Sequence, residues 1–387
     1  MNTEQKIFID LLADHINNRE STIREVNCDW NILLDYARKH NVVGIIYSQC
    51  KNDIPLYLEK SFQKDVLGNV YYQTIRNIEV ELIKKEFRDA GIPFFIIKGP
   101  AIADLYPIPQ YRSMGDTDIV VHEVDREKCD TILNQNGFIC KSKHVDQWRY
   151  YKNHLLYEVH DRLVYDEAVN EDCHVSFFNN CWQYVSNGQL DWDFHLLFLI
   201  LHLRKHFMNS GVGFRQFMDL AIVVQKKEIE WTWVSTKLNE LGLLPFAQRC
   251  FGFVRRWFQI ETPIAIDIDN DFYEEATQKI FIDGVFGFCN TDNMDATIIN
   301  EIRGRKLPGL KKTMMLLAKV FPPVDELEYV GYYNYLQKCP ALLPIAWIQR
   351  WIRGIYTKEY NLNSMKKFFV SNKRVDQRNS FFKKWGL

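Results

Sequence analysis

Apolar residues recur at helical spacing through most of the first ninety positions. Residues 5–16 and 30–49 each carry apolar side chains three and four positions apart, which is typical of amphipathic helices. The same spacing continues through residues 61–90, which contain no proline and only one glycine, Gly68. Gly91 and Pro93 then end the pattern. The sequence therefore predicts an N-terminal helical segment over residues 1–90, with a long helix over 61–90.

The pattern changes between residues 91 and 190. Short β-rich runs at 94–97 and 117–121 predict strands, and each is followed by a helical stretch, at 100–106 and at 124–138. Gly137 closes the second helix. Two further strands are expected at 147–153 and 155–163, separated by a turn near Asn153. These elements predict a small module of helices and strands over residues 91–190.

Helical spacing returns after residue 190 and continues toward the end of the chain. Helices are expected at 193–207, 214–225, 231–242, 245–258, 295–304, 309–320 and 343–356. Residues 366–387 are basic, with Phe and Trp interleaved. The predicted fold class is α+β: a mixed-sheet module lies between N-terminal helices and a C-terminal helical domain over 191–387 that ends in the basic tail.

Composition and charge narrow the class of protein. The chain is 47% hydrophobic and 25% charged, which is enough apolar material for a packed core and excludes a disordered chain. Its formal net charge of −1 provides no overall attraction to nucleic acid or to an anionic membrane. No transmembrane segment is expected, because no run approaches the length of a spanning helix.

The cysteines and the N-terminus bear on the compartment. The nine cysteines contain no Cys-x-x-Cys pair, and an odd, unpatterned set is typical of reduced thiols. The first residues are acidic where a secretory signal needs basic and then apolar ones. The expected location is cytoplasmic. The sequence leaves the oligomeric state open.

Two carboxylates stand at the entrance to a strand that is otherwise apolar. Asp116 and Asp118 precede Ile119, and residues two apart on a strand project from the same face. Like charges this close repel unless a cation lies between them. Mg²⁺ suits such a pair, because it prefers carboxylate oxygens and substrate phosphates, and Mn²⁺ is the alternative. An isolated Asp-x-Asp is nevertheless common in proteins without a metal.

Other residues of the same module complete a candidate site. Glu158, on a later strand, is the expected third carboxylate, and alternation places His160 on its face. Lys98 and Gly99 stand at a strand-to-helix turn, where Gly allows close backbone approach to a phosphate. Lys98 and Arg112 add positive charge for a triphosphate. Each feature alone has an ordinary structural explanation, and the combination is what indicates a site.

These motifs resemble the uncharacterised bacterial nucleotidyltransferases of the DNA polymerase β-like superfamily. The resemblance rests on Lys98-Gly99, Leu105-Tyr106, Arg112, Gly115-Asp116-Thr117-Asp118 and the Glu158-Val159-His160 strand, and extends more loosely to Arg215 and Asp219. It covers roughly residues 90–225. Pro100 follows Gly99 where the superfamily usually has a Ser that contacts phosphate.

The resemblance implies a polymerase β-like nucleotidyltransferase module and a reaction. A nucleoside monophosphate passes from an NTP to an acceptor, with Asp116, Asp118 and Glu158 as catalytic residues that bind Mg²⁺ or Mn²⁺. Lys98, Gly99, Arg112 and Gly115 are then expected to bind the nucleotide, and His160, His202, Arg215 and Asp219 to lie on the substrate side. The acceptor is a small molecule, a sugar, a protein or an RNA end, and the sequence does not distinguish them. A protein acceptor includes the case of a protein-modifying toxin.

A rival from another class is a non-catalytic nucleotide-binding or protein-interaction protein that retains the fold. Pro100 in place of Ser favours this rival, and the three carboxylates favour the enzyme.

Three further features have two interpretations each. His202 and His206 have the spacing of two metal ligands on a helix, but the Glu of a metalloprotease helix is missing between them, which favours a role on a helix face. Residues 345–356 are amphipathic, and a buried helix is preferred over one on a membrane or partner. The basic tail is expected to be largely solvated, with RNA or lipid headgroups as the alternative partners.

Overall fold

The computed structural model describes residues 1–21, 28–144, 147–165, 172–209, 211–285, 321–327, 332–356 and 379–387. Ahead of the sheet lie four helices: α1 (Thr3–Ile16), α2 (Trp30–Lys39), α3 (Val43–Cys50) and α4 (Leu56–Asp89). The predicted long helix is α4, which has 34 residues and begins five residues earlier than expected. It ends where Gly91 adopts a φ of 66°, a conformation that favours glycine.

The strands form a five-stranded mixed sheet in the order β1-β2-β5-β4-β3. They are β1 (Phe94–Ile97), β2 (Asp116–Val121), β3 (Ile139–Lys143), β4 (Trp148–Lys152) and β5 (Leu155–His160). The β2–β5 pair is parallel, whereas β1–β2, β3–β4 and β4–β5 are antiparallel. The predicted fold class of helices around a mixed sheet is confirmed. The third strand, β3, was missed, because its sequence is polar and lacks β-rich alternation.

Short helical elements connect the strands, and a hairpin follows the sheet. The connections include α5 (Gly99–Ala103), η1 (Pro109–Tyr111), η2 (Glu123–Asp125) and α6 (Arg126–Gln135). After β5 come α7 (Asp172–Asn179), η3 (Cys181–Tyr184) and the two-stranded hairpin β6 (Val185–Ser186) with β7 (Gln189–Leu190). The turn expected near Asn153 is present, and Asn153 has a φ of 53° there.

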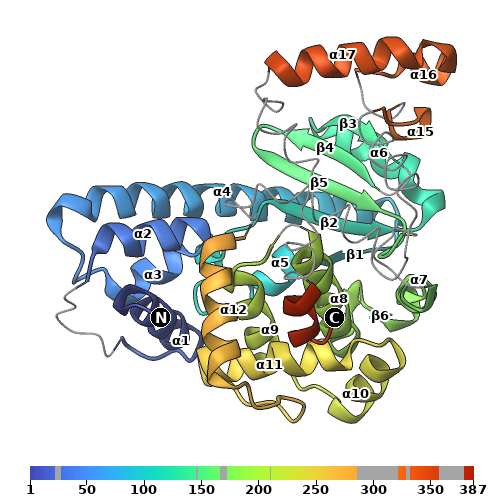
Figure 1. Ribbon diagram of the computed structural model, residues 1–387. Helices are drawn as coiled ribbons and strands as arrows, with labels where there is room; N and C mark the ends of the chain where they lie inside the picture. Colours follow the sequence, from blue (N-terminus) through green and yellow to red (C-terminus); the bar gives the residue numbers. More distant parts are fainter. Residues whose placement is uncertain are drawn as a thin grey trace.

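A helical body covers one face of the sheet. It contains α8 (Trp192–Asn209), α9 (Phe214–Lys226), α10 (Trp231–Glu240), α11 (Leu244–Phe258) and α12 (Asn270–Asp283). Figure 1 shows α8 and α9 on the same side of the sheet as α1, with α4 running along the sheet. The helix α12 was not predicted. The helices expected at 295–304 and 309–320 lie outside the described residues.

Two hydrophobic cores position the sheet. Phe94, Ile119 and Tyr157 pack on one face against α4 and α6, whereas Phe95 and Val120 pack on the other face in the core of the helical body. Strand alternation therefore turns the even-numbered residues of β2 toward the helical body. The face that carries Asp116 and Asp118 is the one that α8 covers.

The N-terminal helices and the helices after the sheet share one core. Phe8 of α1 contacts Phe214 of α9 and Phe281 of α12, with ring centroids 5.5 and 5.4 Å apart. The predicted boundaries near residues 90 and 190 coincide with the end of α4 and the start of α8. The division into three domains stays a prediction.

The structure corrects the expectation of a buried helix near the C-terminus. The elements α15 (Val324–Leu327), α16 (Tyr335–Lys338), η4 (Pro340–Leu342) and α17 (Leu343–Tyr356) form a small cluster around Leu336 and Ala346. In Figure 1, α17 lies beyond the sheet, away from the helical body. Its Ile345, Ile348 and Ile352 are more than half exposed. The helix packs into the small cluster through the side that carries Ala346 and leaves these isoleucines on the surface.

The last residues are also placed differently from the solvated tail that the sequence predicts. Within the described part of the tail, residues 379–387, the side chains of Phe381, Phe382 and Trp385 are buried in the core. Trp385 packs against Phe253, with centroids 4.6 Å apart and rings nearly parallel. The tail can bury its aromatic side chains although it is basic, because Lys383 and Lys384 stay exposed to solvent and no lysine has to enter the core.

Replacing the buried aromatic anchor of the tail should destabilise the whole helical body. We expect Trp385→Ala to lower the free energy of unfolding by about 3–5 kcal/mol, the usual cost of removing a large core aromatic. Lys383→Ala, two residues away and exposed, should change it by less than about 0.5 kcal/mol. Urea unfolding followed by circular dichroism measures both. Equal effects of the two substitutions would contradict the packing described.

Candidate active site

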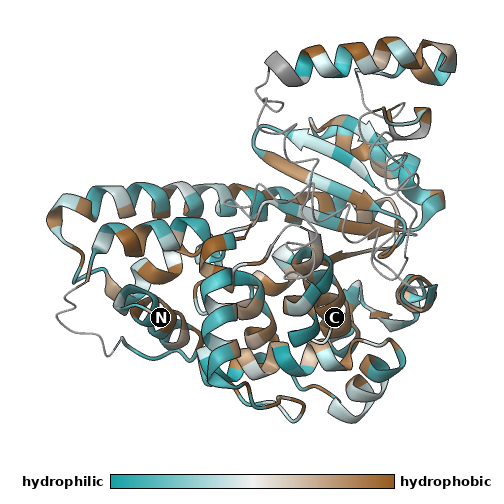
Figure 2. Cartoon of the chain, in the orientation of Figure 1, coloured by the Kyte–Doolittle hydropathy of each residue, from teal (hydrophilic) through white to brown (hydrophobic). Residues whose placement is uncertain are grey.

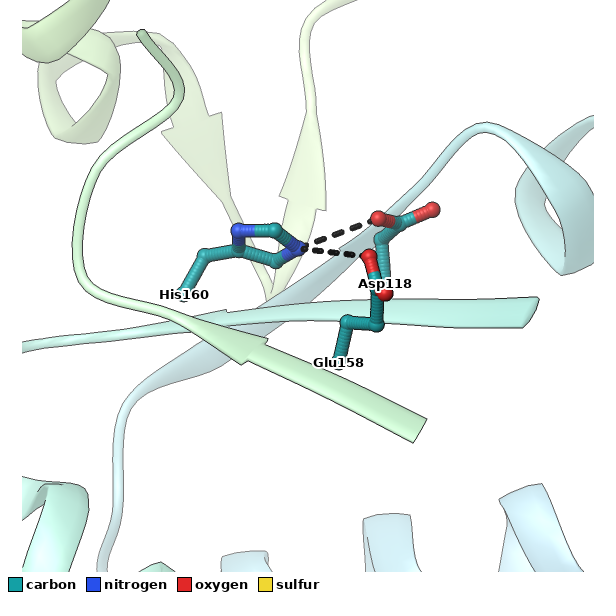
Figure 3. Close-up of side chains that lie close together, drawn as sticks. All are labelled: Asp118, Glu158 and His160. Atoms are coloured by element: carbon teal, nitrogen blue, oxygen red, sulfur yellow. Dashed lines mark hydrogen bonds and ion pairs between the residues drawn. The ribbon is translucent and has the colours of Figure 1, made fainter. Parts of the chain in front are cut away.

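The pairing of β2 with β5 brings the central acidic residues together. The parallel register places Asp118 beside Glu158. His160, two residues further along β5, reaches back so that its Nε2 lies 3.0 Å from Asp118 Oδ1 and 3.8 Å from Glu158 Oε2 (Figure 3). One ligand atom from each of the three residues lies within 4.8 Å of the others. Among the described residues, this is the group whose spacing suits a metal ion.

Asp118 is a buried carboxylate held in its charged form. Its side chain is 2% exposed, and Lys98 Nζ lies 3.0 Å from Oδ1. Burial by itself raises the pKa of Asp118, but the charge of Lys98 and the hydrogen bond with His160 outweigh burial and lower the pKa to about 2. Asp118 is therefore an anion at neutral pH.

Glu158 is the more basic of the two paired carboxylates. Burial and the neighbouring charge of Asp118 raise its pKa, and Arg149 partly opposes that shift through an ion pair of 2.9 Å to Oε1. Two adjacent carboxylates thus differ in proton affinity. This difference is typical of sites in which one carboxylate binds a cation and the other accepts a proton.

Lys98 occupies an unusual backbone position. Its φ is 56°, which is uncommon for a residue with a side chain. Three contacts hold it there: the backbone N–H donates to His195 Nε2 at 3.2 Å, the carbonyl accepts from the N–H of Ile102 at 3.0 Å, and the ammonium pairs with Asp118. The strain is balanced by these contacts, and they fix the ammonium beside the acidic pair.

Gly99 follows Lys98 at a point where the backbone is crowded. A Cβ on Gly99 would lie 3.1 Å from Met114 Sδ and 3.4 Å from the carbonyl oxygen of Asp116. Glycine lets α5 approach β2 closely without a shift of the Met114 side chain. Gly115 differs, since a Cβ there would meet nothing within 4 Å. The predicted contacts of both glycines with a nucleotide stay predictions.

Two arginines from flanking helices hold the loop that leads into Asp116, and Arg112 within the loop ties it to α5. Arg76 of α4 donates to the carbonyl oxygens of Met114 and Gly115 at 3.0 and 3.1 Å. Arg215 of α9 donates to the carbonyl oxygen of Ser113, and Arg112 donates to that of Gly99 at 3.1 Å. Elements before and after the sheet in sequence thus fix the loop. Sequence reasoning missed Arg76, whose only signal is an arginine on the buried face of an amphipathic helix.

Arg112 and Asp219 form a buried ion pair. Arg112 Nε and Nη2 donate to the two carboxylate oxygens of Asp219, both at 2.7 Å, and Tyr106 Oη donates to the same group at 2.7 Å. This bidentate pair ties the loop to α9. Arg112, expected to bind the nucleotide, and Arg215 and Asp219, expected on the substrate side, all line the cleft, but their described contacts are internal to the protein. Their roles stay predictions.

His202 and His206 project from α8 into the same space. Their Nε2 atoms lie 2.9 Å apart. Burial, together with the charge of Lys98, lowers the pKa of His202 and lowers that of His206 to about 4. Both imidazoles are therefore neutral at pH 7. The described residues place no third His, Cys, Asp or Glu ligand beside this pair, so the alternative of a two-histidine metal site gains no support.

The acidic group, His202 and His206 line one cleft of about 970 Å³. Asp116 is half-buried at the start of β2 and lies in this cleft, although it falls outside the close group of Asp118, Glu158 and His160. All eleven predicted site residues are at the cleft: Lys98, Gly99, Arg112, Gly115, Asp116, Asp118, Glu158, His160, His202, Arg215 and Asp219. Sequence reasoning missed Arg149, which pairs with Glu158. It noted His195 at helical spacing with His202 and His206 but missed its contact with the Lys98 backbone.

A mixed sheet with an Asp-x-Asp strand beside a Glu-bearing strand defines a protein of the nucleotidyltransferase class. Residues 27–259 match a family described as an uncharacterised nucleotidyltransferase, and the chain belongs to that family. The resemblance inferred from the motifs around Asp116 and Asp118 is thus confirmed. No curated protein and no solved structure showed significant similarity to the chain. None of the described helices is long and apolar enough to cross a membrane.

Breaking the buried ion pair from one side should be costly. Asp219→Asn leaves the guanidinium of Arg112 buried without a counter-charge, so we expect a loss of about 3–5 kcal/mol in the free energy of unfolding. The double variant Arg112→Met/Asp219→Leu should lose less than Asp219→Asn alone, because it buries no uncompensated charge. Urea unfolding of the three proteins gives the comparison. A double variant less stable than Asp219→Asn would contradict this account.

Acid should destabilise the protein partly through His195. Burial and the charge of Lys98 lower its pKa to about 4, compared with 6.5 when unfolded. Between those values the unfolded chain binds the proton and the folded one does not, so stability is retained above pH 6.5 and falls as the pH is lowered toward 4. His195 should therefore contribute up to about 1.4 kcal/mol per pH unit to the slope of unfolding free energy against pH. This contribution should disappear in His195→Gln.

Urea midpoints measured at pH 7, 6 and 5 for wild type and His195→Gln test this dependence. Other buried histidines contribute equally to both proteins, so the difference between the two slopes reports on His195. Parallel slopes would show that His195 does not titrate as described.

Proposed function

We propose that the protein transfers a nucleoside monophosphate from an NTP to an acceptor bound in the cleft and releases pyrophosphate. The observation that carries the proposal is the register of β2 and β5. It places an ionised Asp118 beside a more basic Glu158 at the cleft. Membership of the nucleotidyltransferase family supports the same reaction class.

The chemistry of the donor set fits Mg²⁺ or Mn²⁺. Carboxylate oxygens are the ligands that these cations prefer, and the charged Asp118 meets that need at neutral pH. Asp116, Asp118 and Glu158 would hold the cation. When bound, it neutralises phosphate charge and orients the NTP. The Lys98 ammonium pairs with Asp118. When an NTP binds, this ammonium could leave the carboxylate and pair with a phosphate oxygen instead.

Glu158 would accept the proton of the acceptor hydroxyl. The acceptor oxygen forms a bond to the α phosphorus of the NTP, the bond from that phosphorus to pyrophosphate breaks, and the hydroxyl proton passes to Glu158. The raised pKa of Glu158 favours this role, and the ion pair with Arg149 fixes one of its oxygens. His160 and the neutral His202 line the same cleft and would contact the acceptor.

The acceptor remains one of four classes: a small molecule, a sugar, a protein or an RNA end. The acceptor would be identified by incubating the protein with cell extract, Mg²⁺ and NTPs labelled at the α phosphorus. Transfer leaves that label on the acceptor, which can then be isolated. The cytoplasmic location expected from the cysteines stays a prediction.

A non-catalytic nucleotide-binding protein is the second candidate. The observation that favours it is that Lys98, His160 and Arg149 already form ion pairs or hydrogen bonds with the two central carboxylates. Binding of NTP without transfer to any component of a cell extract would make this candidate the better one.

Substitutions of the two carboxylates should have different effects. Glu158→Gln keeps shape but removes basicity, so we expect the transfer rate to fall by about 10²–10⁴-fold while NTP affinity stays within a factor of about three. Asp118→Asn removes a charge that the cation needs, so both NTP affinity in Mg²⁺ and transfer should fall. Asp104→Asn, an exposed Asp outside this cleft, is the matched control.

Calorimetric titration with a non-hydrolysable NTP gives the affinities, with and without EDTA, and label transfer gives the rates. EDTA should weaken NTP binding to wild type far more than to Asp118→Asn. A wild-type rate in Glu158→Gln would rule out its role as proton acceptor. Equal NTP affinity in wild type and Asp118→Asn would rule out the assigned cation site.

A further inference from the structure

The long helix α4 carries apolar side chains on two opposite faces. Its buried face packs on the sheet and on the N-terminal helices through Phe62, Val66, Val80, Ile83 and Phe87. On the other side lie Leu67, Tyr71, Ile78 and Leu82, which are 67%, 62%, 65% and 39% exposed. We call these four residues the outer stripe.

The outer stripe lies along one side of α4 as two pairs, Leu67 with Tyr71 and Ile78 with Leu82, with the exposed Thr74 between them. At about 100° per residue, its four members fall within a sector of about 60°, opposite the buried positions. Figure 2 shows hydrophobic residues interspersed with hydrophilic ones along α4. A helix on the surface of a monomer normally has one apolar face. A second apolar line on the solvent side indicates a contact surface for another molecule.

The spacing of the outer stripe identifies the partner. Leu67 and Leu82 are equally distant in sequence from the midpoint between Thr74 and Ile75, and so are Tyr71 and Ile78. A second α4 running antiparallel, with its midpoint at the same place, therefore meets each large side chain with another large one. Such self-complementarity is what a two-fold symmetric interface requires.

Charges beside the stripe are consistent with a modest interface. The same symmetry sets the exposed Lys60 opposite the exposed Asp89 of the second copy, an attractive pair. It also sets Lys64 opposite Lys85, which is repulsive, although Lys85 has its own ion pair with Asp89. The stripe covers about 23 Å of helix, at 1.5 Å per residue. This is short for a large permanent interface, so we expect dissociation in the micromolar range.

We propose that two copies of this chain associate through antiparallel contact of their α4 helices about a two-fold axis between Thr74 and Ile75. The inner face of the same helix carries Arg76, which holds the carbonyl oxygens of Met114 and Gly115. Dimerisation would therefore brace the helix that supports the loop before Asp116. The proposal does not depend on the transferase activity.

Analytical ultracentrifugation across a range of concentrations tests the association. Wild type should pass from monomer to dimer as its concentration rises. Ile78→Glu should raise the dissociation constant at least about 10-fold, because each substitution enters a two-fold interface twice. Ile348→Glu is the matched control, since Ile348 on α17 is 61% exposed and lies outside the stripe.

Two outcomes would overturn the proposal. One is a wild type that stays monomeric at every concentration up to its solubility limit. The other is a dimer that survives Ile78→Glu, whether or not Ile348→Glu disrupts it. Circular dichroism spectra of both variants establish that the fold is intact, which is expected because both side chains are exposed.

Disulfide trapping tests the antiparallel arrangement itself. In the proposed dimer, Thr74→Cys lies beside the axis and should cross-link to itself under mild oxidation. Leu67→Cys or Leu82→Cys alone should not cross-link, whereas their mixture should, because these positions face each other. The parent protein with Cys173→Ser and Cys339→Ser is the background, since both cysteines are exposed. Self-linking of Leu67→Cys as efficient as that of Thr74→Cys would contradict the antiparallel register.

Discussion

The burial of a charged carboxylate at the centre of the sheet is the constraint on which the site depends. Asp118 is almost completely enclosed, and an isolated anion at such a place would be prohibitively unfavourable. Lys98 and His160 compensate it from one strand on each side. The positive φ of Lys98, the His195 imidazole behind it and the parallel register of β2 and β5 all serve this compensation. The low pKa of Asp118 follows from this compensation, whereas burial and the charge of Asp118 raise the pKa of Glu158.

A second requirement is that the loop before Asp116 stays in place. Its carbonyl oxygens accept hydrogen bonds from arginines that come from α4 and α9, far apart in sequence. The Arg112–Asp219 pair adds a bidentate link to α9. The helices before and after the sheet are therefore structural parts of the site. The family match over residues 27–259 includes helices on both sides of the sheet, from α2 to α11.

Apolar surface is distributed unevenly over the molecule. The tail hides Phe381, Phe382 and Trp385 in the core, whereas α4 and α17 leave apolar residues exposed. These two helices differ in what their exposed residues imply. The outer stripe of α4 is symmetric about its own midpoint and fits a second copy. The exposed face of α17 has no described feature that identifies a partner.

The sequence by itself determined the elements that rest on local periodicity, and with them the candidate site. The 3.6-residue spacing predicts α4 and α8–α11. Alternation places Asp116 and Asp118 on one face of their strand and Glu158 and His160 on one face of theirs, because side-chain direction follows from backbone geometry alone. The register of β2 and β5, which brings the two pairs to the same face of the sheet, came from the tertiary structure. Only the tertiary structure decided the order of the strands, the partners of Arg76, Arg112 and Asp219, and the burial of Trp385. Those features depend on contacts between residues tens to hundreds of positions apart. No local pattern encodes which buried arginine meets which carbonyl oxygen, or which aromatic residue of a basic tail enters the core.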